Sequence, residues 1–166
     1  MPARTSAPNQ ETPLSSPSIA LRILSTLFLF WLSAGRVVAD PAADVEQILR
    51  VIRQDQPVPS LHYLRRAESI NAACAYFRGQ YRAIDITVET RPHSDSVASI
   101  LLQIPGADQT QQILPAVSRV LGPPHASDPK QSTYGWAWPT YRTASVHYAP
   151  GGGGQAGFTV VSIFER

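Results

Sequence analysis

The chain has 166 residues, a formal net charge of +2 and a single cysteine, Cys74. One cysteine excludes an internal disulfide framework, so the fold depends on the packing of one hydrophobic core. Three arginines and one glutamate precede Asp40. The rest of the chain is therefore formally neutral, and we expect no nucleic-acid partner, because such partners require a basic surface.

The beginning of the chain predicts an export signal. A short apolar run, residues 23–32, follows Arg22 directly. This run is too short to span a membrane, which takes about 20 residues, and a positive charge before it is typical of a signal peptide. Small residues in Val37-Val38-Ala39 fit a cleavage site before Asp40. We expect residues 1–39 to be a polar lead plus a secretory signal, and residues 40–166 to be a single periplasmic or secreted domain.

Two membrane-bound alternatives follow from the same segment. An uncleaved anchor is disfavoured because the apolar run is short. A lipoprotein would carry a cysteine after Leu32-Ser33-Ala34-Gly35, where the chain has Arg36. We therefore expect no lipid anchor and no stable membrane insertion after the signal is removed.

Two helices are predicted at the start of the exported domain. Asp40-Pro41 is a typical helix start. The apolar residues that follow recur with helical spacing, at Val45, Ile48, Leu49 and Ile52. A second helical pattern runs over residues 63–77, with Ser60 as a possible cap and Gly79 at the end.

The chain then changes to a strand pattern. Strict alternation over residues 83–89 predicts a strand, and residues 97–104, apolar on both faces, predict a second, central strand in an antiparallel hairpin. Residues 108–121 predict a further helix, with a kink or a late start at Pro115, because an interior proline costs about 3 kcal/mol. Three more strands are expected over residues 134–138, 143–148 and 158–164. Together these elements predict an α+β fold, with an antiparallel sheet of about five strands packed on two or three helices.

Two short matches raise the question of an internal repeat. Glu46-Gln47-Ile48-Leu49 resembles Gln111-Gln112-Ile113-Leu114, and Tyr81-Arg82-Ala83 resembles Tyr141-Arg142-Thr143. Each pair occupies the same stage of a helix-then-strands unit. Because the matches are so short, chance is the simpler explanation.

The second half of the chain resembles a known fold group. Leu121-Gly122-Pro123-Pro124 ends a helix, Trp136 follows, and Thr159-Val160-Val161-Ser162-Ile163-Phe164 closes the paired strands. This unit is similar to that of small bacterial envelope proteins in the outer-membrane-assembly lipoprotein and beta-lactamase-inhibitor-protein fold group. The resemblance implies a helix-plus-antiparallel-sheet module that binds other proteins. It covers about a third of the chain: the first half fits poorly, and the lipoprotein cysteine is missing.

The familiar catalytic and metal-binding motifs are missing from the sequence. The four histidines have no His-x-x-x-His spacing, and there is no Cys-x-x-Cys, so we predict no metal site and no cofactor. The enzymatic alternative is a small hydrolase with a Cys74–His147 dyad and an acid such as Asp85. Small apolar neighbours favour instead a buried, unreactive Cys74, and we assign no catalytic residue.

Aromatic residues on one predicted strand are the best candidates for a binding site. Tyr134, Trp136 and Trp138 share a strand face, and Tyr141 and Arg142 follow. Trp, Tyr and Arg are enriched at protein-binding hot spots, although such a face also suits a core, above all at Trp136. The leading interpretation is a non-enzymatic protein-binding module of the bacterial envelope, acting as an inhibitor, an immunity-type protein or an assembly factor. The alternatives are the small hydrolase and a structural periplasmic domain.

Overall fold

The computed structural model describes residues 40–165, except for residues 70 and 141. The predicted export signal, residues 1–39, and the candidate contact residue Tyr141 therefore lie outside the described residues. All structural statements below concern the described part of the chain.

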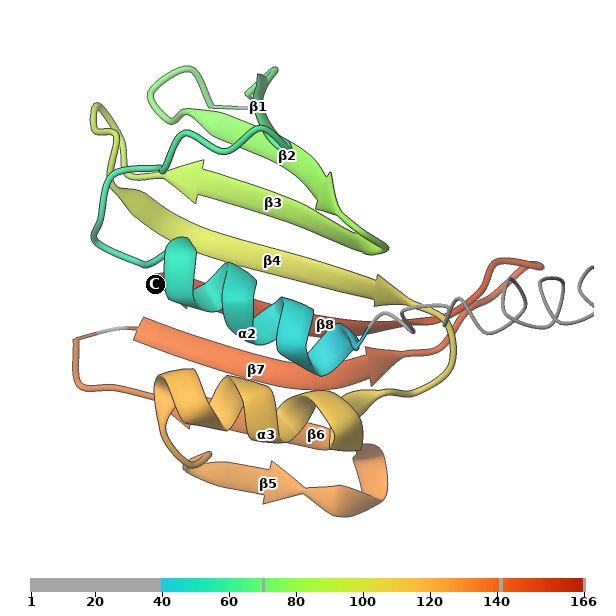
Figure 1. Ribbon diagram of the computed structural model, residues 1–166. Coiled ribbons are helices and arrows are strands. Elements are labelled where there is room, and N and C mark those ends of the chain that lie inside the picture. Colours follow the sequence, from blue (N-terminus) through green and yellow to red (C-terminus); the bar gives the residue numbers. More distant parts are fainter. Residues whose placement is uncertain (1–39, 70, 141, 166) are drawn as a thin grey trace, which may run out of the picture. The chain divides into compact units, whose positions relative to one another are not determined.

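Two α-helices and eight strands make up the described domain (Figure 1). The helices are α2 (Pro41–Val51) and α3 (Thr110–Leu121), and a short 3-10 helix covers Pro129–Gln131. The strands, in chain order, are β1 (Leu64–Ala67), β2 (Tyr76–Tyr81), β3 (Ile84–Thr90), β4 (Val97–Pro105), β5 (Ala126–Asp128), β6 (Thr133–Ala137), β7 (Arg142–Ala149) and β8 (Phe158–Glu165).

All eight strands form one antiparallel sheet in the order β1-β2-β3-β4-β8-β7-β6-β5. The prediction of an α+β fold with an antiparallel sheet is confirmed, and β4 is central, as its apolar residues on both faces indicate. The predicted number of about five strands is too low, because β1, β2 and the three-residue β5 were not expected.

The predicted helix over residues 63–77 is wrong: this segment forms β1, a loop and the start of β2. Its apolar residues pack from two paired strands rather than from one helical face. Gly79 pairs with Leu64 across the two strands, and a Cβ on Gly79 would overlap the carbonyl oxygen of Tyr63. The glycine therefore permits the close approach of β1 rather than ending a helix.

The core lies between one face of the sheet and the two helices (Figure 1). The predicted apolar face of α2 is buried, with Val45, Ile48 and Ile52 at 0 % exposure and Leu49 at 2 %. Alternate residues of β3 face these side chains, among them Ile84, Ile86 and Val88. Each such side chain contributes about 1.5–3 kcal/mol through removal from water.

The two halves of the domain share one order of elements. Each half is a helix followed by four strands, and β4 and β8 join the halves at the centre of the sheet. The directions of the elements differ between the halves. Strands β4 and β8 run in opposite directions, whereas the two helices run in the same direction across the sheet, side by side (Figure 1). Their C-terminal ends consequently lie together, near the start of β4 and the end of β8.

Candidate functional site

Two of the predicted contact residues, Tyr134 and Trp136, are core residues of β6. Their side chains are 7 % and 2 % exposed. The Trp136 indole Nε1 donates to the carbonyl oxygen of Gly122 at 2.9 Å, and the Tyr134 hydroxyl accepts from Gln111 Nε2 at 2.6 Å. Both bonds tie β6 to α3 or to the residue that ends it. The structure thus favours the core interpretation for this pair over a contact surface.

The other two, Trp138 and Arg142, lie together at the end of the hairpin between β6 and β7. The backbone N–H of Trp138 donates to the carbonyl oxygen of Arg142 at 3.0 Å. The Trp138 ring is partly buried and meets the His125 ring edge-on, with 5.6 Å between centroids. Both side chains line a pocket, and they are the part of the predicted site that the fold brings together.

This pocket, called here the arginine pocket, has a volume of about 380 Å³ and lies at the C-terminal ends of both helices. Its apolar wall consists of the partly buried Val120, Leu121 and Trp138 together with the buried core residues Leu49, Ile52, Ile100 and Ile163. Its polar wall consists of Arg50, Arg53, Arg119, Arg142 and Gln54. Among the described residues that line it, none is acidic.

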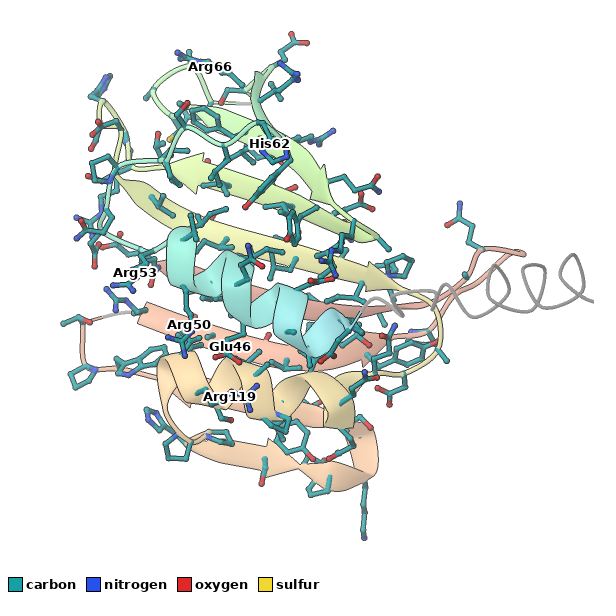
Figure 2. All side chains as sticks on the ribbon, viewed as in Figure 1. Glu46, Arg50, Arg53, His62, Arg66 and Arg119 are labelled. Atoms are coloured by element: carbon teal, nitrogen blue, oxygen red, sulfur yellow. The ribbon has the colours of Figure 1, made fainter. Side chains whose placement is uncertain are left out.

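The helix ends explain why arginines gather here. Arg50 lies in the last turn of α2 and Arg119 in the last turn of α3, where a cation is favoured by the partial negative charge of a helix C-terminus. Glu46 bridges the helices, at 2.7 Å from Arg50 and 2.6 Å from Arg119 (Figure 2). Hydrogen bonds from Arg119 and then Arg50 lower the pKa of Glu46 below its ordinary value. Arg53 lies beyond the end of α2 (Figure 2).

A second ion-pair network holds the opposite wall. Arg142 pairs with Asp55, which also pairs with Arg91 at 2.5 Å. Arg91 in turn binds Glu165 through two hydrogen bonds, at 2.8 and 2.9 Å. The network connects the segment after α2 with Arg91 just after β3, the start of β7 and the end of β8, and so fixes the position of Arg142.

Charges around the pocket do not cancel within the described chain. Five arginines, those of the pocket wall and Arg91, face three carboxylates, on Glu46, Asp55 and Glu165. Two helix C-termini add about half a negative charge each, which leaves about one positive charge. Of these five arginines, Arg53 is the one with no carboxylate partner among the described residues; its Nε donates to the carbonyl oxygen of Arg50 at 2.9 Å.

Gln54 supplies an unsatisfied acceptor at the pocket. Its Nε2 donates to the carbonyl oxygen of Ala98 at 2.7 Å, which fixes the orientation of the amide. Its Oε1 is buried and has no hydrogen-bond partner among the described residues. A buried acceptor without a donor is costly, by about 1–3 kcal/mol.

The fold separates the two residues of the alternative hydrolase. Cys74 precedes β2 beside the end of β3, where the neighbouring Ala75 N–H donates to Thr90 Oγ1 at 2.8 Å, and His147 lies on β7. Three strand steps separate β3 from β7, which amounts to about 14 Å at the usual strand spacing. Burial, followed by the influence of Glu89, raises the pKa of the Cys74 thiol, the opposite of what a nucleophile needs.

The described residues contain no group of three or more His, Cys, Asp or Glu side chains placed to hold a metal ion. Likewise, no helix within residues 40–165 is long and apolar enough to cross a membrane.

Comparisons with known proteins add no relatives: no family model, no curated protein and no solved structure matches this chain. The geometry of the arginine pocket is therefore the main ground for a functional proposal.

The sequence interpretation missed four of the five polar residues of the pocket: Arg50, Arg53, Gln54 and Arg119. A local signal exists for two of them, because Arg50 and Arg119 each stand near the end of an amphipathic helix. No local pattern says that the two helices run in the same direction, and that arrangement is what brings the arginines together.

Proposed function

We propose that this domain is a non-enzymatic protein-binding module of the bacterial envelope and that it holds its partner at the arginine pocket. The observation that carries the proposal is the meeting of Trp138 and Arg142 with three further arginines around an apolar wall. Tryptophan and arginine are the residues most enriched at binding hot spots, and such hot spots occupy pockets.

The chemistry of the pocket specifies the kind of partner. An apolar wall rewards the burial of an apolar side chain, and about one excess positive charge rewards an acidic group. The partner should therefore present an apolar residue and a negative charge close together. A neutral or basic apolar segment would leave the arginines uncompensated.

The biological setting of this proposal comes from the sequence. The export signal predicted in residues 1–39 and the resemblance of the second half to envelope binding modules both support a role as an inhibitor, an immunity-type protein or an assembly factor. The hydrolase alternative gains no support, because Cys74 and His147 lie on opposite halves of the sheet.

A capture experiment with matched controls tests the proposal. The purified protein is immobilised and exposed to envelope extract from the producing cells, and retained proteins are identified by mass spectrometry. The site variants are Trp138→Ala and Arg142→Ala. The controls are Tyr76→Ala and Arg78→Ala, which remove the same kinds of side chain from the sheet face turned away from the helices, since the intervening Phe77 packs against the core.

We expect one partner to be retained by the unaltered protein and by both controls, and to be lost with both site variants. A partner that is lost equally with Tyr76→Ala and Arg78→Ala would place binding elsewhere. If no protein is retained specifically, the structural-domain alternative is favoured and the proposal fails.

A further inference from the structure

We infer that the arginine pocket recognises the C-terminal end of the partner's polypeptide chain, a free α-carboxylate on an apolar last residue. This inference rests on the proposed function and specifies which part of the partner binds. Two features of the pocket each match one group of such a chain end: the excess of arginine matches the carboxylate, and the apolar wall matches the last side chain.

The first feature, the excess of arginine, favours a ligand with a single carboxylate. Arg53 has no carboxylate partner among the described residues, and its Nε is already used by the carbonyl oxygen of Arg50. Its terminal nitrogens are the natural donors for a carboxylate, which arginine binds through two parallel hydrogen bonds. The excess of about one positive charge around the pocket suits a single negative charge rather than a phosphate with nearly two.

The choice of a peptide over a lipid follows from the proposed function, in which the partner is a protein. A fatty acid also carries a carboxylate and an apolar tail, so the test below includes one as a competitor. Gln54 does not decide between the two, because its Oε1, although without a hydrogen-bond partner among the described residues, is buried away from any bound molecule.

The second feature sets the size and character of the last side chain. Val120, Leu121 and Trp138 are the partly buried, and so still accessible, side chains of the apolar wall, in a pocket of about 380 Å³. This volume is at the lower end of the range for small-ligand sites, about 300–1,000 Å³. It fits one or two residues of a chain end, as in other modes of terminal-carboxylate capture, and is too small for a whole helix.

Peptide binding to the full chain tests the inference directly. Fluorescein-labelled hexapeptides ending in Leu, Phe or Val are titrated with the protein and followed by fluorescence polarisation. Each peptide is made twice, with a free C-terminal carboxylate and as the C-terminal amide. Octanoate serves as the competing amphiphile, because it carries a carboxylate and an apolar tail but no peptide.

We expect at least one free-acid peptide to bind, and its amide to bind more weakly by about tenfold or more. Arg53→Gln and Arg142→Gln should weaken binding of the free acid toward the level of the amide, and Arg78→Gln should not. Trp138→Ala should weaken both peptide forms, with unchanged far-ultraviolet circular dichroism as the check on folding. Two results would overturn the inference. One is equal affinity for the free-acid and amide peptides, and the other is saturable binding of octanoate that displaces no peptide.

A second arm separates this inference from the proposed function. The partner captured from envelope extract is trimmed with a carboxypeptidase and tested again. Loss of binding after trimming supports the inference. Retained binding that still depends on Trp138 and Arg142 would overturn it, whereas the proposed function would stand.

Discussion

The guanidinium of Arg142 is ion-paired with the carboxylate of Asp55, which lies 87 positions earlier in the chain. Because Asp55 also holds Arg91 and Arg91 holds Glu165, this contact closes a four-residue network. The network joins the segment after α2 to the last residues of β8 and the first of β7. One wall of the arginine pocket is thereby fixed by charges that are distant in sequence.

Replacement of Asp55 by asparagine should weaken this network without unfolding the domain. All members are between 35 % and 42 % exposed, so water screens the pairs, and we expect a loss of about 1 kcal/mol or less in the free energy of unfolding. The loss should shrink in about 1 M salt, where charges are screened over about 3 Å. Urea denaturation at low and high salt measures it. Asp85→Asn is the control, since that carboxylate accepts a hydrogen bond from the neutral Gln80. A salt-independent loss of several kcal/mol would contradict this account.

Substitution of Gly79 by alanine tests the pairing of β1 with β2. The new Cβ would overlap the backbone carbonyl of Tyr63, so β1 must shift or detach. We expect the domain to lose about 1–3 kcal/mol of stability, as is usual for overpacked sites. Gly152→Ala is the control, because nothing among the described atoms lies within 4 Å of a Cβ placed there. Equal stability of the two variants would argue against the β1–β2 register.

Local periodicity predicted the elements whose packing partners lie on one face. Helix α2, strands β3 and β4, helix α3 and the last three long strands all follow their apolar pattern. The segment over residues 63–77 did not, because its apolar residues come from two short paired strands and a loop. Pairing of β1 with β2 depends on contacts across the hairpin, which helical spacing in one segment does not report.

The candidate site was predictable only in part for a similar reason. Alternation correctly placed Tyr134 and Trp136 on one face of a strand, but the position of α3 decides that this face is buried. Trp138 and Arg142 lie on either side of the turn between β6 and β7, and this turn brings them together. Arg50 and Arg119 join them because two helices run in the same direction, a long-range property with no local sequence signal.

The two tryptophans should respond very differently to replacement by phenylalanine. Trp136→Phe removes the hydrogen bond from Nε1 to the Gly122 carbonyl and leaves space in the core, so we expect a loss of about 1–3 kcal/mol. Trp138→Phe keeps a partly buried ring beside His125 and should cost less than about 1 kcal/mol. Denaturation followed by circular dichroism compares them without relying on tryptophan emission. A larger loss of stability with Trp138→Phe than with Trp136→Phe would contradict the assignment of Trp136 to the core and Trp138 to the pocket.

Pro115 offers a stabilising substitution. It lies inside α3, which begins at Thr110, so the sequence alternative of a helix starting at the proline is not observed. A proline in a helix interior removes one backbone hydrogen bond and costs about 3 kcal/mol. Because Pro115 is exposed, alanine there disturbs no core contact. Alanine also gives the unfolded chain greater freedom, which offsets part of this gain. We therefore expect Pro115→Ala to raise the free energy of unfolding by about 1–2 kcal/mol. A thermal midpoint below that of the unaltered protein would contradict this.

Acidification should weaken the contact between the helices at Glu46. Since Arg119 and Arg50 lower the pKa of Glu46 in the folded protein, this carboxylate adds stability above the pKa that it has in the unfolded chain, about 4.3. That contribution is lost as the pH falls from this value through the lower pKa of the folded state. Asp108, whose pKa is lowered chiefly by hydrogen bonding to Thr110, acts with the same sign.

Glu46→Gln should therefore make the domain less stable at neutral pH and less sensitive to acid. The urea midpoint, measured from pH 7 down to about pH 3, should fall less for this variant than for the unaltered protein, and the two curves should converge at the acid end. Glu68→Gln is the control, because Glu68 is exposed and forms no ion pair with the described residues. If Glu46→Gln and the unaltered protein give parallel curves over this range, the bridge from Glu46 to Arg50 and Arg119 does not stabilise the helix pair in solution.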